Sequence, residues 1–297
     1  MNTRQHQRCV LLIIVLISLF FAPLNVLPSS DIEEFKNAEE KEHIQSERYA
    51  LLFGGGFNNK NNLESFYTNI EYVYDALRQL GYKKKNIKTL FFGGETPKRP
   101  IIEGEATRKR LLTELDNFAA VMGSEDSLLL FRSGHGIIEL VFDKHSQMSL
   151  GTEAVMQLSD GCLSPTELQE KLLKIQCEQI IFILSQCFSG PFTEIAKNID
   201  NIVIITETDA LGYAIHQTQM KTGWKYAAWP FVKCLFDGFL DQNSEASARS
   251  VAYAFAYMLE KNPNIIGFPI RADRPLLKEN PQIRYGKKLI KGTVYLD

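Results

Sequence analysis

The sequence has little cysteine, and none of it is spaced to bind zinc. No two cysteines form a C-x-x-C pair, and this excludes the common structural zinc sites. Long basic runs are also missing and the formal net charge is -2, so nucleic acid is not an expected partner. The five cysteines of the 297 residues are Cys9, Cys162, Cys177, Cys187 and Cys234.

Phosphate-binding signatures are missing as well. The run Gly54-Gly55-Gly56 is followed by no G-K-[ST], and the chain contains no G-x-G-x-x-G. We therefore interpret this run as a tight turn after a strand. The chain has no internal repeats, and its 45% hydrophobic content suffices for one large core.

The N-terminus has the pattern of an export signal. Arg4 and Arg8 precede an apolar run from Cys9 to Ala22, which is typical of a secretory signal. An uncleaved anchor is the alternative, because apolar character continues to Leu27. We favour the cleaved signal. The chain then divides into residues 1–28 as signal or anchor, 29–47 as an acidic linker, and 48–297 as a single domain. Either form of the leader predicts a secreted, periplasmic or membrane-anchored domain that faces away from the cytoplasm.

Short apolar runs alternate with amphipathic stretches along the domain. This order predicts an α/β fold, a three-layer sandwich around a mainly parallel sheet. Helices are expected over 66–80, 107–122, 227–239 and 246–261, with another starting at Ser164-Pro165, and the tail from residue 262 has no clear assignment. Core strands are expected over 49–53, 87–92, 127–131, 179–184 and 201–206.

Two of these strands end in reactive side chains. The strand over 127–131 leads into Arg132-Ser133-Gly134-His135-Gly136, and the strand over 179–184 leads into Ser185-Gln186-Cys187-Phe188-Ser189-Gly190. Ligands of open α/β sheets bind at the carboxyl ends of the strands. A thiol and an imidazole held together there form a nucleophile and its base. The N–H groups of Gly136 and Cys187 are candidate donors to an oxyanion.

These motifs resemble those of the caspase–legumain group of cysteine peptidases (clan CD). His135 precedes Cys187 by about 50 residues, as in caspases. Gly190 follows Cys187 at the spacing of legumains and metacaspases. The resemblance runs from about Tyr49 to Phe239 and implies a caspase-like fold, nearest to the legumain type. It also implies that Cys187 is the nucleophile and His135 the general acid and base, with neither metal nor cofactor.

Substrate preference is less clear from the sequence. Phe188 follows Cys187 where legumains carry an acidic residue, so a preference for asparagine is not expected. The candidate pocket residues are Thr206, Glu207 and Asp209 in the turn after the fifth strand, and Lys60, the one cation of the loop after the first strand. Glu207 and Asp209 either attract a basic side chain or are solvated turn residues.

Three functions remain open. A cysteine endopeptidase would hydrolyse a protein or peptide substrate through a thioester acyl-enzyme. A transamidase would pass the same acyl group to an amine, and an inactive binding module would keep the fold alone. An intact pair of His135 and Cys187 argues against the third. The oligomeric state cannot be predicted from these patterns.

Overall fold

The computed structural model describes residues 46–142, 149–215, 228–241, 250–266, 278–289 and 294–296. Residues Ser46–Asp297 form one compact unit. The predicted signal or anchor and nearly all of the predicted linker lie outside the described residues. Within the described ranges, no helix is both long enough and apolar enough to span a bilayer.

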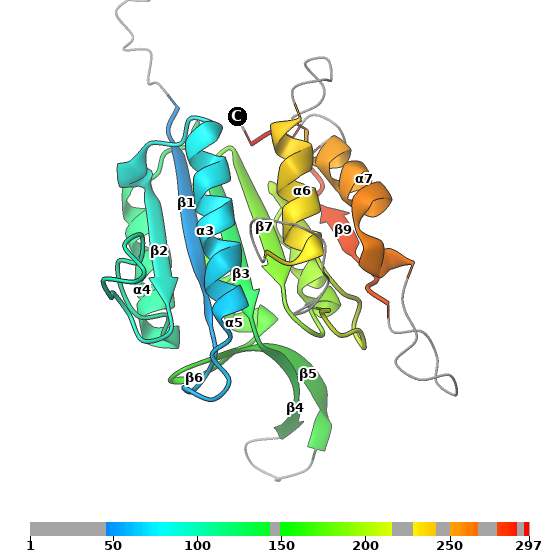
Figure 1. Ribbon diagram of the computed structural model, residues 1–297. Coiled ribbons are helices and arrows are strands. Elements are labelled where there is room, and N and C mark those ends of the chain that lie inside the picture. The colour runs from blue at the N-terminus through cyan, green and yellow to red at the C-terminus, as the bar shows by residue number, and fades with distance from the viewer. Residues whose placement is uncertain are drawn as a thin grey trace, which may run out of the picture. The chain divides into compact units, whose positions relative to one another are not determined.

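A six-stranded sheet forms the centre of the unit (Figure 1). The strand order is β2-β1-β3-β7-β8-β9, and every neighbouring pair is parallel except β8 and β9. The five predicted core strands are confirmed. β9 is an antiparallel edge strand in the tail that the sequence left unassigned. The strands are β1 (Arg48–Gly55), β2 (Ile87–Phe91), β3 (Ser127–Gly134), β7 (Gln179–Ser185), β8 (Ile202–Thr206) and β9 (Gln282–Tyr285).

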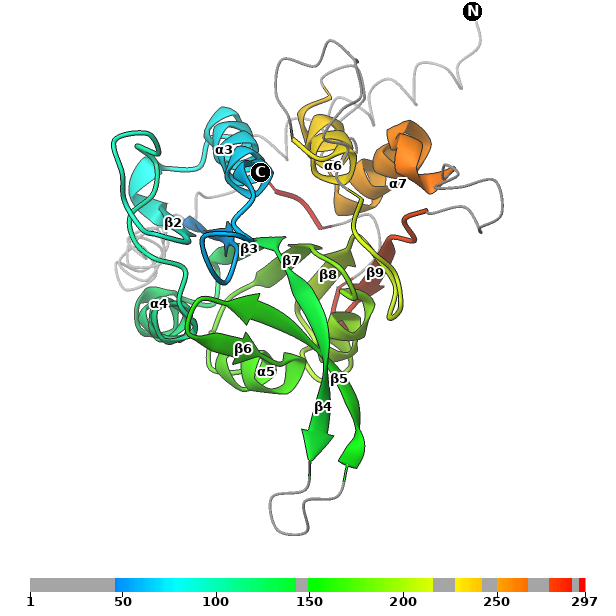
Figure 2. The ribbon, with the colours of Figure 1, turned by 60° about the horizontal axis from the view of Figure 1, so that its bottom comes forward.

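The parallel strands are buried on both faces, which explains their nearly continuous apolar sequences. Helices α3, α6 and α7 pack on one face, where Phe131 and Phe236 meet. Helices α4 and α5 and the 3₁₀ segment η2 cover the other face, as the turned view shows (Figure 2). The helical elements are α3 (Glu64–Gln79), η1 (Lys84–Asn86), α4 (Arg108–Val121), α5 (Pro165–Leu172), η2 (Gly190–Lys197), α6 (Pro230–Leu240), α7 (Val251–Lys261) and η4 (Pro263–Ile265).

Helix starts follow the polar residues that precede them. The Thr107 hydroxyl accepts the Arg110 N–H at 3.0 Å and caps α4. At the predicted start of α5, Ser164 and Glu167 form a capping box, with Pro165 in the first turn.

A second sheet of three strands leaves the main sheet directly after His135 (Figure 2). The strands β4 (Gly136–Phe142) and β5 (Ser149–Leu158) form an antiparallel hairpin, and β6 (Gly161–Leu163) pairs with β5. The predicted thiol nucleophile and imidazole base therefore stand where the main sheet gives way to this arm.

Candidate functional site

The register of β3 and β7 sets the positions of His135 and Cys187. The last paired residues of the two parallel strands are Ser133 and Ser185. His135 and Cys187 each lie two residues beyond that pair. Neighbouring strands are about 4.8 Å apart, so the register brings the two segments to adjacent points of one sheet edge. Sequence reasoning predicted this juxtaposition, and the pairing of the strands supports it.

The His135 ring is oriented by the loop after β1. Its Nε2 lies 2.8 Å from the carbonyl oxygen of Asn61. A carbonyl accepts hydrogen bonds only, so Nε2 carries the hydrogen and Nδ1 is the nitrogen that takes up a proton. The rings of Phe57 and Phe66 contact the imidazole edge-on, with centroids at 5.9 and 5.0 Å. Asn61 was missed by sequence reasoning because a backbone carbonyl leaves no mark in the sequence.

Cys187 sits in a half-buried turn after β7. Burial raises the pKa of its thiol, and hydrogen bonds from the backbone N–H groups of Ala214 and of Cys187 itself lower that pKa in part. The negative charge of Glu279 raises the pKa further. The raised pKa favours the thiol over the thiolate, so a nucleophilic role for Cys187 would require a base.

Phe188 has a backbone conformation that its side chain disfavours. Its φ is 55°, and within the described ranges no other residue except glycine has a positive φ. Such a conformation costs about 1–3 kcal/mol and persists where surrounding contacts impose it. The Phe188 N–H donates to the carbonyl of Gly212 at 2.9 Å, and its ring meets Tyr213 at 5.0 Å. The nucleophile turn is thus locked against the loop that follows β8.

Gly136 allows the two reactive segments to approach each other. A Cβ at this position would lie 2.1 Å from the carbonyl oxygen of Cys187 and 2.6 Å from Nε2 of Gln186. Any larger residue would force the start of β4 away from the Cys187 turn. Gln186 is fully buried, and neither polar atom of its amide bonds to another described residue. Sequence reasoning gave Gln186 no role beyond its place in the motif.

The four predicted pocket residues lie at different depths. Thr206 and Glu207 are fully buried, with the Thr206 hydroxyl donating to the carbonyl of Thr208 at 3.0 Å. Both lie beneath the surface, which corrects the expectation that their side chains line a pocket. Asp209 is half-buried and accepts the Leu211 N–H at 3.0 Å and the side-chain amide of Asn280 at 2.9 Å. Lys60 is exposed beside Asn61.

Two exposed apolar side chains lie in the described part of the loop after β8. Leu211 is 77% exposed and Tyr213 is 55% exposed, and the Tyr213 ring contacts that of Phe188, the residue after Cys187. This cluster was missed because the sequence signal of the turn is dominated by its acidic residues. Together with Asp209, it gives the loop both an apolar face and a carboxylate.

A buried cation lies near the C-terminal end of β3. Arg132 is fully buried, and burial lowers the pKa of its guanidinium to about 9. It donates to the carbonyls of Ser133 and Gln157, both at 2.8 Å, so it joins β3 to β5. Its guanidinium also lies over the ring of Phe53 at 5.6 Å. Arg132 thereby fixes the arm that begins at Gly136.

Three other cysteines lie within the described residues. Cys162, Cys177 and Cys234 are free thiols, and burial raises the pKa of each. Cys234 lies in the core, as is common for a small apolar residue. Across the described ranges, no three His, Cys, Asp or Glu side chains form a group suited to a metal ion.

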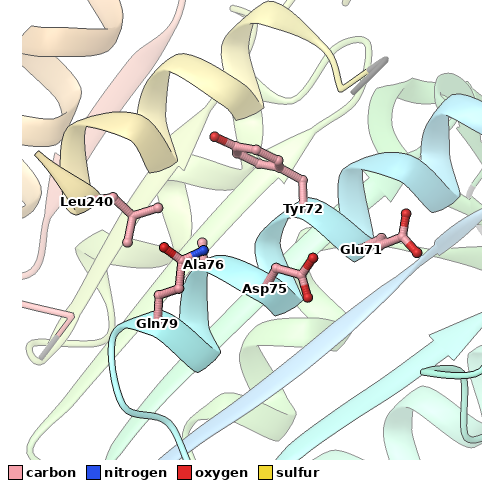
Figure 3. A pocket seen from close by; sticks show the side chains of 6 residues that line it. All are labelled: Glu71, Tyr72, Asp75, Ala76, Gln79 and Leu240. Carbon is pink, nitrogen blue, oxygen red and sulfur yellow. The ribbon is translucent and has the colours of Figure 1, made fainter. Parts of the chain in front are cut away.

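A hollow between two helices lies apart from the candidate dyad (Figure 3). Its volume is about 90 Å³, and it flanks the C-terminal half of α3, whereas Phe66 at the other end of α3 contacts His135. The residues that line it are Glu71, Tyr72, Asp75, Ala76, Gln79 and Leu240.

Comparisons with known proteins inform the fold alone. No family model and no curated protein matches the chain. Among solved structures, the chain is similar to the protein GSU0716 from Geobacter sulfurreducens, with a TM-score of 0.54 and 16% sequence identity. The match covers 84% of this chain and 100% of that chain. It supports an α/β fold with a mostly parallel sheet between helices, and function has to be argued from the site.

Proposed function

We propose that the chain is a cysteine endopeptidase of the caspase–legumain type, with a caspase-like fold, that acts outside the cytoplasm. The observation that carries the proposal is the register of β3 and β7, in which His135 and Cys187 follow the same terminal pair by the same number of residues. The fixed His135 tautomer and the glycine at position 136 support it, because both suit acyl transfer.

In the proposed reaction, Nδ1 of His135 takes the thiol proton as the Cys187 sulfur attacks the peptide carbonyl carbon. The carbonyl oxygen becomes negative and accepts hydrogen bonds from the N–H groups of Gly136 and Cys187. The C–N bond breaks, the leaving amine receives the proton from His135, and a thioester remains. Water then attacks the thioester with His135 as base, which releases the acid and restores the thiol.

The proposed substrate side chain combines an apolar stem with a positive charge. Tyr213 and Phe188 offer apolar surface next to Cys187, and Leu211 and Asp209 lie in the same loop as Tyr213. Lysine and arginine bury an apolar stem while keeping the charge near water. Since Glu207 is buried, Asp209 is the acidic residue of this turn that is left to attract such a side chain.

The direct test compares the full chain with Cys187→Ala and His135→Ala on peptide libraries. Each variant is expected to lose peptide cleavage by at least about 100-fold while remaining folded. Cleavage that survives Cys187→Ala would contradict the proposal. Adding a nucleophilic amine separates hydrolysis from transamidation: a ligated product that outweighs the hydrolysed one would identify a transamidase.

A further inference from the structure

A cluster of buried polar side chains lies beneath the Cys187 turn. Glu207 and Glu279 are both buried, although each carries a carboxyl group. Asn262, at the end of α7, and Asn264, in η4, are buried beside them. Burying two carboxyl groups is costly unless each is hydrogen-bonded, so their retention calls for a physical reason.

Hydrogen bonds connect Glu279 to three parts of the chain. Its carboxylate accepts the side-chain N–H groups of Asn262 at 2.7 Å and Asn264 at 2.8 Å. It also accepts the backbone N–H of Ile215 at 3.0 Å, and Asn264 donates to the Ile215 carbonyl at 2.9 Å. Ile215 is therefore held on both of its backbone polar groups by side chains from the C-terminal part of the chain.

The second carboxyl group completes the cluster. The Ser185 hydroxyl donates to Oε2 of Glu207 at 2.7 Å. Burial and the neighbouring Glu279 raise the pKa of Glu207 well above its usual range. Burial also raises the pKa of Glu279, so this pair of buried carboxyl groups binds a proton more readily than isolated carboxyl groups do. The other ionisable groups that face this pair are Cys187, from the β7 turn, and Cys234, from α6.

The residue clamped by Glu279 directly follows Ala214, whose backbone N–H lowers the pKa of the Cys187 thiol. Two residues earlier, Gly212 accepts the N–H of Phe188 at 2.9 Å. The segment 212–215 thus wraps the nucleophile turn, and its last residue is fastened by Glu279 and Asn264.

We propose that Glu279 is a positioning residue that holds the N–H of Ala214 against the Cys187 sulfur. Glu207 supports it as the other carboxyl group of the pair that binds a proton. This inference rests on the proposed function, since it assigns Cys187 the part of nucleophile. It links the unassigned C-terminal tail to the reactivity of a residue about 90 positions earlier in the chain.

Two effects of Glu279 on Cys187 have opposite signs, which makes the proposal testable. As a negative charge, Glu279 disfavours the thiolate. As a clamp on Ile215, it favours the thiolate by aiming an N–H donor at it. Glu279→Gln removes the charge and keeps an oxygen for the Ile215 N–H, whereas Glu279→Leu removes both.

The experiment measures the rate at which iodoacetamide alkylates Cys187, from pH 5 to pH 10, with the site read by mass spectrometry. We expect Glu279→Leu to react at least about tenfold more slowly than Glu279→Gln at neutral pH, equivalent to about one unit in thiol pKa. Equal rates for the two variants, or faster reaction of Glu279→Leu, would overturn the proposal.

Controls separate positioning from loss of stability. Glu114, buried in α4 on the opposite face of the sheet, gives the matched variant Glu114→Leu, which is expected to leave Cys187 alkylation unchanged. If Glu279→Leu does not fold, Asn264→Ala removes the donor to the Ile215 carbonyl and keeps the charge, and it must then slow alkylation. Alkylation needs no turnover, so a chain that cleaves no peptide would refute the proposed function and still decide this inference.

Discussion

Replacing Gly136 by alanine tests the proposed oxyanion site at one atom. The new Cβ would stand 2.1 Å from the Cys187 carbonyl oxygen, whereas unstrained contacts begin at about 3.5 Å. The start of β4 and the Cys187 turn must therefore separate by about 1 Å or more. A shift of this size costs about 100-fold in rate, and loss of one oxyanion donor costs about 100- to 1,000-fold.

We therefore expect Gly136→Ala to lower kcat by about 100- to 1,000-fold with a small change in KM. Overpacking should also lower the free energy of unfolding by about 1–3 kcal/mol. Kinetics on a cleaved peptide and urea unfolding measure the two effects separately. Alkylation of Cys187 should persist, since Gly136 is assigned to the oxyanion and not to the thiol.

Gly123→Ala is the matched control. A Cβ there would meet its nearest neighbour, Oδ2 of Asp126, at 3.9 Å, an ordinary contact. It should leave kcat unchanged. A folded Gly136→Ala protein with kcat within about twofold of the parent would refute the reasoning, because a donor displaced by about 1 Å cannot stabilise the oxyanion equally well.

Three further perturbations follow from the same geometry. His135→Ala should slow Cys187 alkylation near neutral pH, where a base has to remove the thiol proton; an unchanged pH profile of alkylation would deny His135 the part of base. Phe188→Gly should relieve about 1 kcal/mol of backbone strain and raise the urea concentration at the midpoint of unfolding. The same change removes the contact with Tyr213, and Tyr213→Ala in the same assay measures the stability lost with that contact. Glu207 has a folded-state pKa above its unfolded value, so its contribution to stability is full below the unfolded pKa and is lost as pH rises toward the folded pKa. In Glu207→Gln, the free energy of unfolding should fall less steeply as pH rises. An unaltered slope of the free energy of unfolding against pH would count against a protonated Glu207.

The sheet and the neighbouring positions of His135 and Cys187 could be predicted because their signals are local. Each core strand is a short apolar run that ends in glycine or small polar residues, and such runs mark buried parallel strands. His135 and Cys187 stand directly after two of these runs. Parallel strands end at the same edge of a sheet, so their proximity followed from the order of elements.

The support around the pair could not be predicted, because it comes from distant or unspecific atoms. Asn61 acts through a carbonyl that any residue would supply. Glu279 and Asn264 lie in a tail whose Pro and Lys content hid an antiparallel edge strand and a buried polar cluster. Glu207 was expected at the surface because acidic turn residues usually are, and burial beside Glu279 reversed that expectation.

The central claim is that Cys187 is the activated nucleophile of the chain. The most direct measurement is to label the full chain with an electrophilic peptide probe and to map every modified cysteine by mass spectrometry. Our account predicts labelling at Cys187 well before Cys162, Cys177 or Cys234, and its loss in His135→Ala. Labelling spread evenly over the four thiols, or strong labelling of Cys187 that does not depend on His135, would contradict it.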